Sequence, residues 1–193
     1  RQMCIRDRYR EMDSFFVGKD CVYVCDMGKR TIYSYSFDGK FLHSLSFPYS
    51  LVFNDVVELP DGRFLCHRPS QSENCKGLWI LDQKGRRVKN LLEYEKGTPC
   101  KNSYWNTLCA QEDGTIKIYN PVDGSYYQYD AVNDTVVRTM RQKSNLPMLA
   151  DFHCSDRELY ETKEECTYSL FTVDGKNLVF SLWSFNSANK GMW

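Results

Sequence analysis

The chain has 193 residues, with 25 Lys plus Arg, 25 Asp plus Glu and a formal net charge of zero. This balance argues against a dedicated binder of nucleic acids or anionic membranes, because such proteins carry a basic excess or stripe. No run approaches the ~20 apolar residues that a membrane-spanning helix needs. Aromatic residues make up 15% of the chain, with 13 Tyr and 11 Phe, and this composition favours β-structure.

The opening, from Arg1 to Arg8, lacks the apolar segment of a signal peptide. It resembles a translated sequencing-adaptor remnant at the end of a metagenomic gene fragment, and a genuine basic N-terminal helix is the alternative. We therefore expect residues 1–16 to be a non-native, adaptor-derived opening plus a lead-in, and residues 17–193 to be the structured domain. In such a fragment, the missing signal says nothing about the compartment.

Short strand-like runs follow one another along the chain and are separated by tight turns. The turns lie at 37–40, 60–63, 83–86, 112–115, 132–135 and 173–176. Asp-Gly pairs supply the positive φ that hairpin turns need, so these turns predict β-hairpins. One kind of turn, at 38–40, 83–86 and 132–135, recurs every ~46–49 residues, which is typical of four-stranded propeller blades.

The hairpins pair into successive blades. We expect a partial first blade at 17–47, a second at 50–94, a third at 102–143 and a fourth at 150–193. In the fourth blade, strands could begin at Leu159 or at Thr167. The predicted fold class is therefore all-β, with about three and a half four-stranded antiparallel blades of a β-propeller.

The repeat itself resembles a known family. Val22-Tyr-Val-Cys-Asp26, followed by the run from Thr31 to Leu42, is similar to the repeat of NHL-like six-bladed propellers, and Asn54–Leu65 and Gly114–Arg138 fit it too. More narrowly, the chain resembles the uncharacterised six-bladed propeller proteins of gut bacteria. This resemblance implies a six-bladed ring in an exported protein, often a lipoprotein, and it carries over no catalytic residue.

Nine cysteines occur, and none of their spacings matches a zinc site or a Cys-x-x-Cys motif. Cys21 and Cys25 share one face of a strand and are interpreted as small buried hydrophobes. A Cys66–Cys75 disulfide across a loop is left open.

Longer connections, at 68–77, 94–102 and 141–150, all fall on the rim opposite the tight turns. Binding residues concentrate on long loops that a rigid scaffold supports, so this rim is the expected ligand face. His43 is instead interpreted as a packed or hydrogen-bonded structural residue, and Trp79 as a residue of the packing between blades. No catalytic residue, metal site or cofactor is predicted. The candidate ligand-binding residues are His67, Arg68, Glu73, Asn74, Lys101, Tyr104 and Trp105.

The favoured function is a non-enzymatic binding or scaffold propeller on the periplasmic or cell-surface side of a bacterial envelope. Its expected partner is a protein, peptide or glycan, with no nucleic acid and no membrane span in this fragment. One alternative is a propeller enzyme acting on glycans or lactones, whose site is completed by the missing blades. The other is a pure protein–protein interaction module, since a fold does not decide function.

Overall fold

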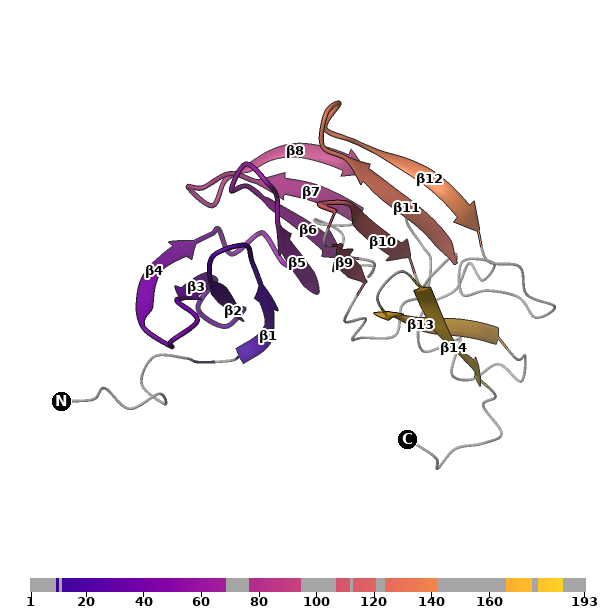
Figure 1. Cartoon of the computed structure of the whole chain (residues 1–193), viewed down its shortest axis with the longest axis horizontal. Helices are drawn as coiled ribbons and strands as arrows, with labels where there is room; N and C mark the ends of the chain where they lie inside the picture. The colour runs from indigo at the N-terminus through magenta and orange to yellow at the C-terminus, as the bar shows by residue number, and fades with distance from the viewer. Residues whose placement is uncertain are drawn as a thin grey trace.

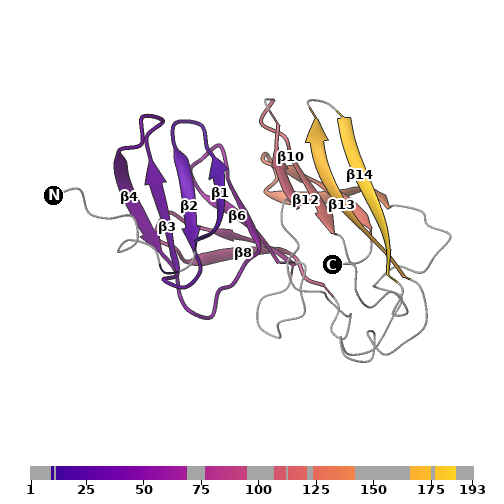
Figure 2. The ribbon, with the colours of Figure 1, turned by 90° about the horizontal axis from the view of Figure 1, so that it is seen from below.

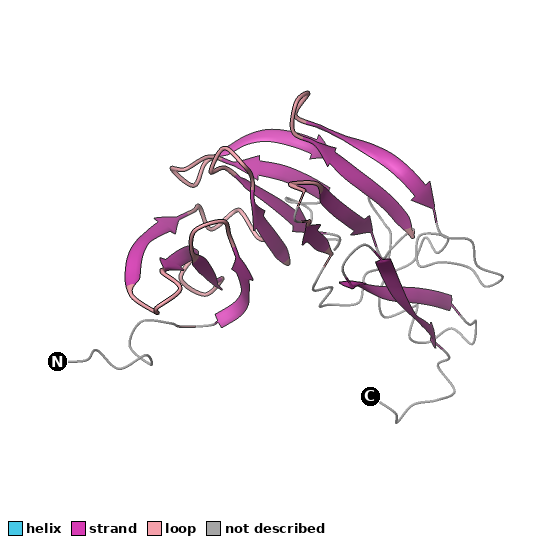
Figure 3. Ribbon diagram, viewed as in Figure 1, coloured by secondary structure: helices cyan, strands magenta, loops and turns pink. Residues whose placement is uncertain are grey.

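The computed structural model describes residues 10, 12–68, 77–94, 107–111, 113–120 and 124–141, and the backbone of two further strands at 166–174 and 177–185. Within these ranges every regular element is a strand (Figure 3). The strands are β1 (Met12–Val17), β2 (Val22–Asp26), β3 (Thr31–Tyr35), β4 (Phe41–Ser46), β5 (Asp55–Glu58), β6 (Phe64–Arg68), β7 (Gly77–Leu81), β8 (Arg87–Leu92), β9 (Leu108–Ala110), β10 (Ile116–Asn120), β11 (Ser125–Asp130), β12 (Thr135–Arg141), β13 (Cys166–Asp174) and β14 (Asn177–Phe185).

The strands form three four-stranded antiparallel sheets, β1–β4, β5–β8 and β9–β12, and β13 pairs with β14. In each sheet the strands are paired in chain order, as predicted for blades. The sheets follow one another around an arc, with the first strand of each on its inner side (Figure 1). β1 contacts β5, and β5 contacts β9. Figure 2 shows the first sheet and the β13–β14 hairpin at opposite ends of this arc.

Four of the tight turns share one geometry, which the sequence dictates. Gly39, Gly62, Gly85 and Gly114 have φ between 72° and 82°. In each turn the glycine N–H donates to the carbonyl three residues earlier, and the residue carrying that carbonyl donates its own N–H to the residue after the glycine. This is a three-residue hairpin loop closed by a left-handed residue, a position that glycine occupies without steric cost. The predicted hairpins are confirmed.

The core lies between neighbouring sheets, and the second sheet buries both of its faces because it contributes residues to two clusters. Trp79 is fully buried between the first and second sheets, which confirms its packing role. Cys21 and Cys25 are buried free thiols in the same cluster, as predicted. A second cluster joins the second and third sheets and consists of Val57, Leu59, Leu65, Leu78, Ile80, Leu108, Ile116, Ile118 and Tyr129.

Several details differ from the expectations. The first blade has all four strands and begins at Met12, inside the stretch assigned to the opening and lead-in, because β1 ends in a Gly18 turn that lacks an Asp-Gly signal. In the fourth blade the first described strand begins at Cys166. The side chain of His43 is exposed rather than packed, since β4 is an outermost strand from which Leu45 packs against the core. Cys66 is a free thiol, so no Cys66–Cys75 disulfide forms.

Candidate functional site

The connections between strands fall into two sets at opposite strand ends. We call the hairpin turns at 18–21, 36–40, 59–63, 82–86, 111–115 and 131–134 the tight-turn rim. The remaining connections join the other strand ends, and we call this side of the sheets, with the described residues of 27–30, 47–54, 93–94, 107 and 124, the long-loop rim. The described residues of the two rims differ in how their polar groups are used.

Charges on the tight-turn rim are paired locally. Ion pairs join Lys40 to Asp38 at 2.6 Å, and Arg86 to Asp82 at 2.7 Å. The turn carboxylates also accept backbone N–H groups, as Asp82 does from Arg86 and Lys84. These backbone hydrogen bonds hold the pKa of Asp82 below its ordinary value. The turns therefore close on themselves and present few groups that still need a partner.

A larger ionic cluster on this rim joins the second sheet to the third. Both terminal nitrogens of Arg63 donate to the carboxylate of Asp134, at 3.0 and 3.3 Å, and its Nε donates to Asp61 at 2.6 Å. Asp134 also accepts the hydroxyl of Tyr129 and lies 3.5 Å from Lys89. Burial alone would raise the pKa of Asp134, but the hydrogen bonds from Arg63 and Tyr129 outweigh burial and lower it. We call this group the Arg63–Asp134 clamp, and its geometry identifies it as a link between blades.

The long-loop rim, in contrast, gathers buried polar side chains. Seven polar or charged side chains are buried among the described residues, and six of them lie at the long-loop ends of strands. The exception, Ser34, lies in the middle of β3. The six are Asp26, Thr31, His67, Thr107, Asn120 and Ser125. Buried polar groups need hydrogen-bond partners, so this rim is held by specific side-chain contacts in addition to backbone hydrogen bonds.

His67 lies at the centre of these contacts. Its side chain is fully buried, with Nδ1 2.6 Å from the Thr107 hydroxyl and Nε2 2.8 Å from the Tyr94 hydroxyl. Burial lowers the pKa of His67 to about 3, so the ring is neutral at pH 7. A neutral ring that donates from Nδ1 to Thr107 and accepts at Nε2 from Tyr94 satisfies both nitrogens.

Asp55 extends this network from β5 to β9. One carboxylate oxygen accepts the Leu108 N–H at 2.9 Å and the Thr107 hydroxyl at 3.5 Å, and the other accepts the Val56 N–H at 3.0 Å. Burial raises the pKa of Asp55 to about 6, although these donors partly offset it. We call Asp55, Thr107, His67 and Tyr94 the His67 network; it links the second and third sheets on the long-loop rim.

The fold and this geometry agree with the family comparison. A sequence model described as 6-bladed beta-propeller matches residues 7–182. The chain belongs to this family. Each four-stranded sheet is thus a propeller blade, and the arc in Figure 1 is part of a propeller ring.

One solved structure shows the same fold, and others are similar to the chain at lower scores. A protein from Bacteroides fragilis that is thought to be exported is 15% identical, with a TM-score of 0.61, and the match covers 92% of this chain and 58% of that one. A Bacteroides caccae protein of unknown function is 12% identical over 63% of this chain and 41% of its own, with a TM-score of 0.44. Virginiamycin B lyase from Staphylococcus aureus is 8% identical over 89% of this chain and 54% of its own, with a TM-score of 0.45.

The chain therefore spans less than two thirds of the length of these structures. Among curated proteins, none matches the sequence.

Two of the seven predicted site residues lie within the described part of the propeller. His67 and Arg68 end β6 on the long-loop rim, as expected, with His67 buried in its network and Arg68 half-buried beside it. The other five predicted residues, Glu73, Asn74, Lys101, Tyr104 and Trp105, lie outside the described residues.

Sequence reasoning missed three members of the network. Asp55 and Thr107 occupy equivalent places in the second and third blades. Asp55 directly precedes Val56, which pairs with Cys66, and Thr107 directly precedes Leu108, which pairs with Ile118. This equivalence could have been found by aligning the blades on Gly62 and Gly114. Nothing local distinguishes Tyr94 from the other tyrosines, because its partner is 27 residues away.

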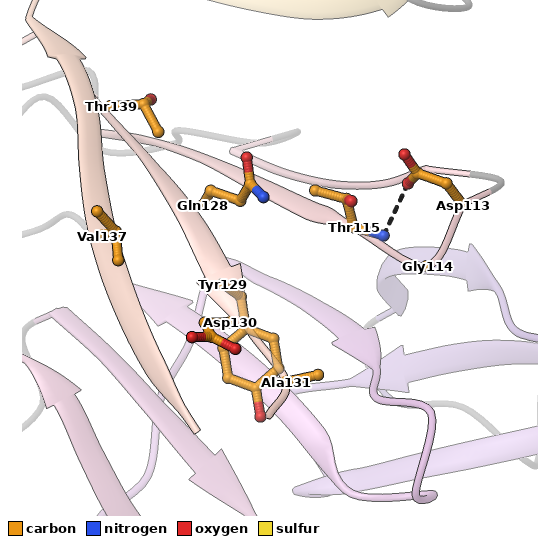
Figure 4. Close-up of a pocket in the computed structure, with 9 residues that line it drawn as sticks. All are labelled: Asp113, Gly114, Thr115, Gln128, Tyr129, Asp130, Ala131, Val137 and Thr139. Carbon is orange, nitrogen blue, oxygen red and sulfur yellow. Dashed lines mark hydrogen bonds between the residues drawn. The ribbon is translucent and has the colours of Figure 1, made fainter. Parts of the chain in front are cut away.

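The third blade also carries an open groove of about 460 Å³ between its inner turn and its outer strands (Figure 4). Gln128 and Val137, which line it, lie on the sheet face opposite the cluster shared with the second blade. Its carboxylates Asp113 and Asp130 are bound by N–H groups of their own turns. Because propeller blades pack face to face, this groove belongs to a packing face and offers no group poised for chemistry.

The described residues contain no cluster of three or more His, Cys, Asp or Glu side chains that could hold a metal ion. No helix in the described part of the chain is long and apolar enough to span a membrane.

Proposed function

We propose that this chain is part of an exported bacterial propeller that binds a ligand on its long-loop rim without changing it chemically. The observation that supports this proposal is the difference between the two rims. The tight-turn rim pairs its own charges, whereas the long-loop rim concentrates buried polar side chains under the longer connections. Binding surfaces in rigid all-β scaffolds are built from such connections.

The chemistry of the His67 network supports binding rather than catalysis. A general base needs an accessible lone pair near the substrate. Both ring nitrogens of His67 are occupied by Thr107 and Tyr94, and its side chain has no solvent exposure. The network thus acts as a support that fixes the strand ends beneath the rim, and Arg68 extends from the same strand toward the ligand.

The expected partner is a protein, peptide or glycan, and the expected compartment is the periplasm or the cell surface. We propose that Arg68, together with Glu73, Asn74, Lys101, Tyr104 and Trp105 of the two neighbouring connections, contacts the partner. His67 contributes by positioning Arg68, its neighbour in β6, and by holding Tyr94 and Thr107, the two ends of the connection between β8 and β9.

Two matched arginine variants test the location of the site. Arg68→Ala removes a cation from the long-loop rim, and Arg86→Ala removes one from the tight-turn rim, where its partner is Asp82. Binding to dextran, polygalacturonate and tryptic peptides of casein is measured by biolayer interferometry. We expect binding of at least one probe, a loss of tenfold or more with Arg68→Ala, and no change with Arg86→Ala.

The size of the bound probe is followed by chromatography over a day. An unchanged probe fits a binding protein, whereas shorter products would favour the alternative of a propeller enzyme. Failure to bind every probe, or an equal loss with Arg86→Ala, would contradict the proposal.

A further inference from the structure

Among the described residues, two that are not glycine have a left-handed backbone. Arg30 has φ of 55° and Asp134 has φ of 53°. Each is the last residue of a four-residue turn, 27–30 and 131–134. Such a conformation costs a residue with a Cβ about 1 kcal/mol or more, and glycine would adopt it freely. The side chain at each position therefore needs its own explanation.

The Arg63–Asp134 clamp explains Asp134. For Arg30 no equivalent ion pair exists, since no carboxylate of the described residues lies within ion-pair distance of its guanidinium. Its Nη1 reaches the Leu51 carbonyl oxygen only at 3.4 Å. Its buried Nε has no hydrogen-bond partner among the described residues. Arg30 is therefore a strained cation whose donors are largely unused.

Tyr49 lies beside this cation and is unusually open. Its ring centroid is 5.6 Å from the guanidinium carbon of Arg30, and its side chain is 73% exposed. Stacking on a ring occupies the flat face of a guanidinium and leaves its in-plane N–H groups for polar partners. Because Nε of Arg30 is buried, the fork that can match a carboxylate is the terminal pair, Nη1 and Nη2. An exposed aromatic ring next to this fork provides an apolar platform for a ligand.

A second orphaned polar atom lies on the same rim, in the connection 47–54 that also carries Tyr49. Asn54 Oδ1 is buried and accepts no hydrogen bond from the described residues. The backbone N–H of Asn54 does donate a hydrogen bond, to the backbone carbonyl oxygen of His67 at 2.9 Å. Unsatisfied buried polar atoms are rare in folded proteins. Two of them therefore lie on neighbouring connections of the long-loop rim, Arg30 Nε in 27–30 and Asn54 Oδ1 in 47–54, so this part of the rim is rich in polar groups that the described residues leave unpaired.

We propose that Arg30 and Tyr49 form a subsite for an acidic sugar, with the uronate carboxylate on the Arg30 fork and the sugar ring against Tyr49. This inference rests on the proposed function, since it names the ligand class of the same rim: a carboxylated polysaccharide. The exposed ring favours a sugar over a small inorganic anion, because an anion has no apolar face to place on it.

The chain offers a matched pair of glycine variants for the test. Arg30→Gly and Asp134→Gly make the same backbone change, and both relieve the left-handed strain, but only Arg30→Gly removes the proposed ligand contact. Arg30→Lys keeps the charge and removes the fork. Binding of polygalacturonate, dextran sulfate and neutral dextran is measured by isothermal titration calorimetry at low and high salt, with the melting temperature of each variant as a folding control.

We expect the unmodified chain to bind polygalacturonate more tightly than either dextran. Arg30→Gly should weaken that binding tenfold or more with an unchanged or higher melting temperature, and Arg30→Lys should give an intermediate loss. Asp134→Gly should keep full binding and lower the melting temperature through loss of the clamp.

Preference for dextran sulfate over polygalacturonate would overturn the carboxylate assignment. Equal binding by the unmodified chain and Arg30→Gly, or no binding of polygalacturonate at all, would overturn the subsite. If dextran still binds in those cases and Arg68→Ala abolishes that binding, the proposed function stands without the subsite. If Arg68→Ala and Arg30→Gly both leave every affinity unchanged, the proposed function fails as well.

Discussion

Replacing His67 with glutamine should reverse the order of stability between the variant and the unmodified chain as the pH falls. Glutamine is neutral at every pH and can occupy one of the two hydrogen-bond positions of the ring, toward Thr107 or toward Tyr94. At pH 7 the lost hydrogen bond and imperfect fit should cost about 1–3 kcal/mol of unfolding free energy.

The magnitude of the reversal follows from the pKa of His67, about 3 in the folded chain against about 6.5 when unfolded. As the pH falls, the His67 side chain of the unfolded state binds a proton before that of the folded state does. The contribution of the neutral, buried His67 to the unfolding free energy is therefore complete above pH 6.5 and is lost as the pH falls toward 3. From pH 7 to pH 4 the loss is about 3 kcal/mol, at roughly 1.4 kcal/mol per pKa unit. Asp55 acts oppositely, since its raised pKa of about 6 favours folding in acid by about 2 kcal/mol over the same range.

In the unmodified chain these two contributions nearly cancel, whereas His67→Gln retains only the contribution of Asp55. Urea unfolding, followed by fluorescence at several pH values, gives the difference in unfolding free energy directly. We expect this difference to change by about 3 kcal/mol and to change sign between pH 7 and pH 4. Parallel stability curves for the two proteins would refute the assignment of a neutral, buried imidazole.

Three further predictions concern the contacts between blades and the turns. Arg63→Met should lower the unfolding free energy by about 1–2 kcal/mol, a modest loss because the clamp is partly exposed. In a double-mutant cycle, the loss from Arg63→Met should be smaller when Asp134 is already Asn, and this coupling should shrink at high salt; purely additive losses would contradict the clamp. Trp79→Ala should lower the unfolding free energy by about 3–5 kcal/mol through the cavity that it leaves. Trp79→Phe should lower it much less, because the buried indole N–H has no hydrogen-bond partner among the described residues; equal losses in urea unfolding would contradict this. Gly39→Ala should cost only about 1 kcal/mol, whereas Gly85→Ala should lower the melting temperature far more, because its Cβ would lie 2.0 Å from a backbone carbonyl oxygen; similar melting temperatures would exclude that clash.

Much of the fold could be predicted because its information is local. The two-residue sequences Asp38-Gly39 and Asp61-Gly62 each predict a hairpin turn, and the spacing of such turns predicts the length of one blade. The prediction was less accurate where the turn has no such signal. The turn that opens with Gly18 ends β1 by a different hydrogen bond, from the Gly18 N–H to the Cys21 carbonyl, so the first blade begins earlier than its turns suggested.

The candidate site could be predicted only in outline, because its contacts join distant parts of the chain. The topology of a four-stranded blade places His67 and Arg68 on the long-loop rim without any knowledge of their partners. Thr107 lies 40 residues from His67 along the chain, and no periodicity links the two. The left-handed backbone of Arg30 is equally hidden, because the sequence Met27-Gly-Lys-Arg30 places its glycine at a different position of the turn.

The imidazole of His67 has a consequence for how such propellers can diversify. Tyr94 and Thr107, the two flanks of one connection, are both hydrogen-bonded to this ring, so the two ends of the connection are anchored to one residue. Doubling the length of a closed loop costs only about 0.6 kcal/mol in closure entropy. A different sequence of different length could therefore be grafted between these two anchors with little effect on the blades, which makes this position a natural one for acquiring or engineering new specificity.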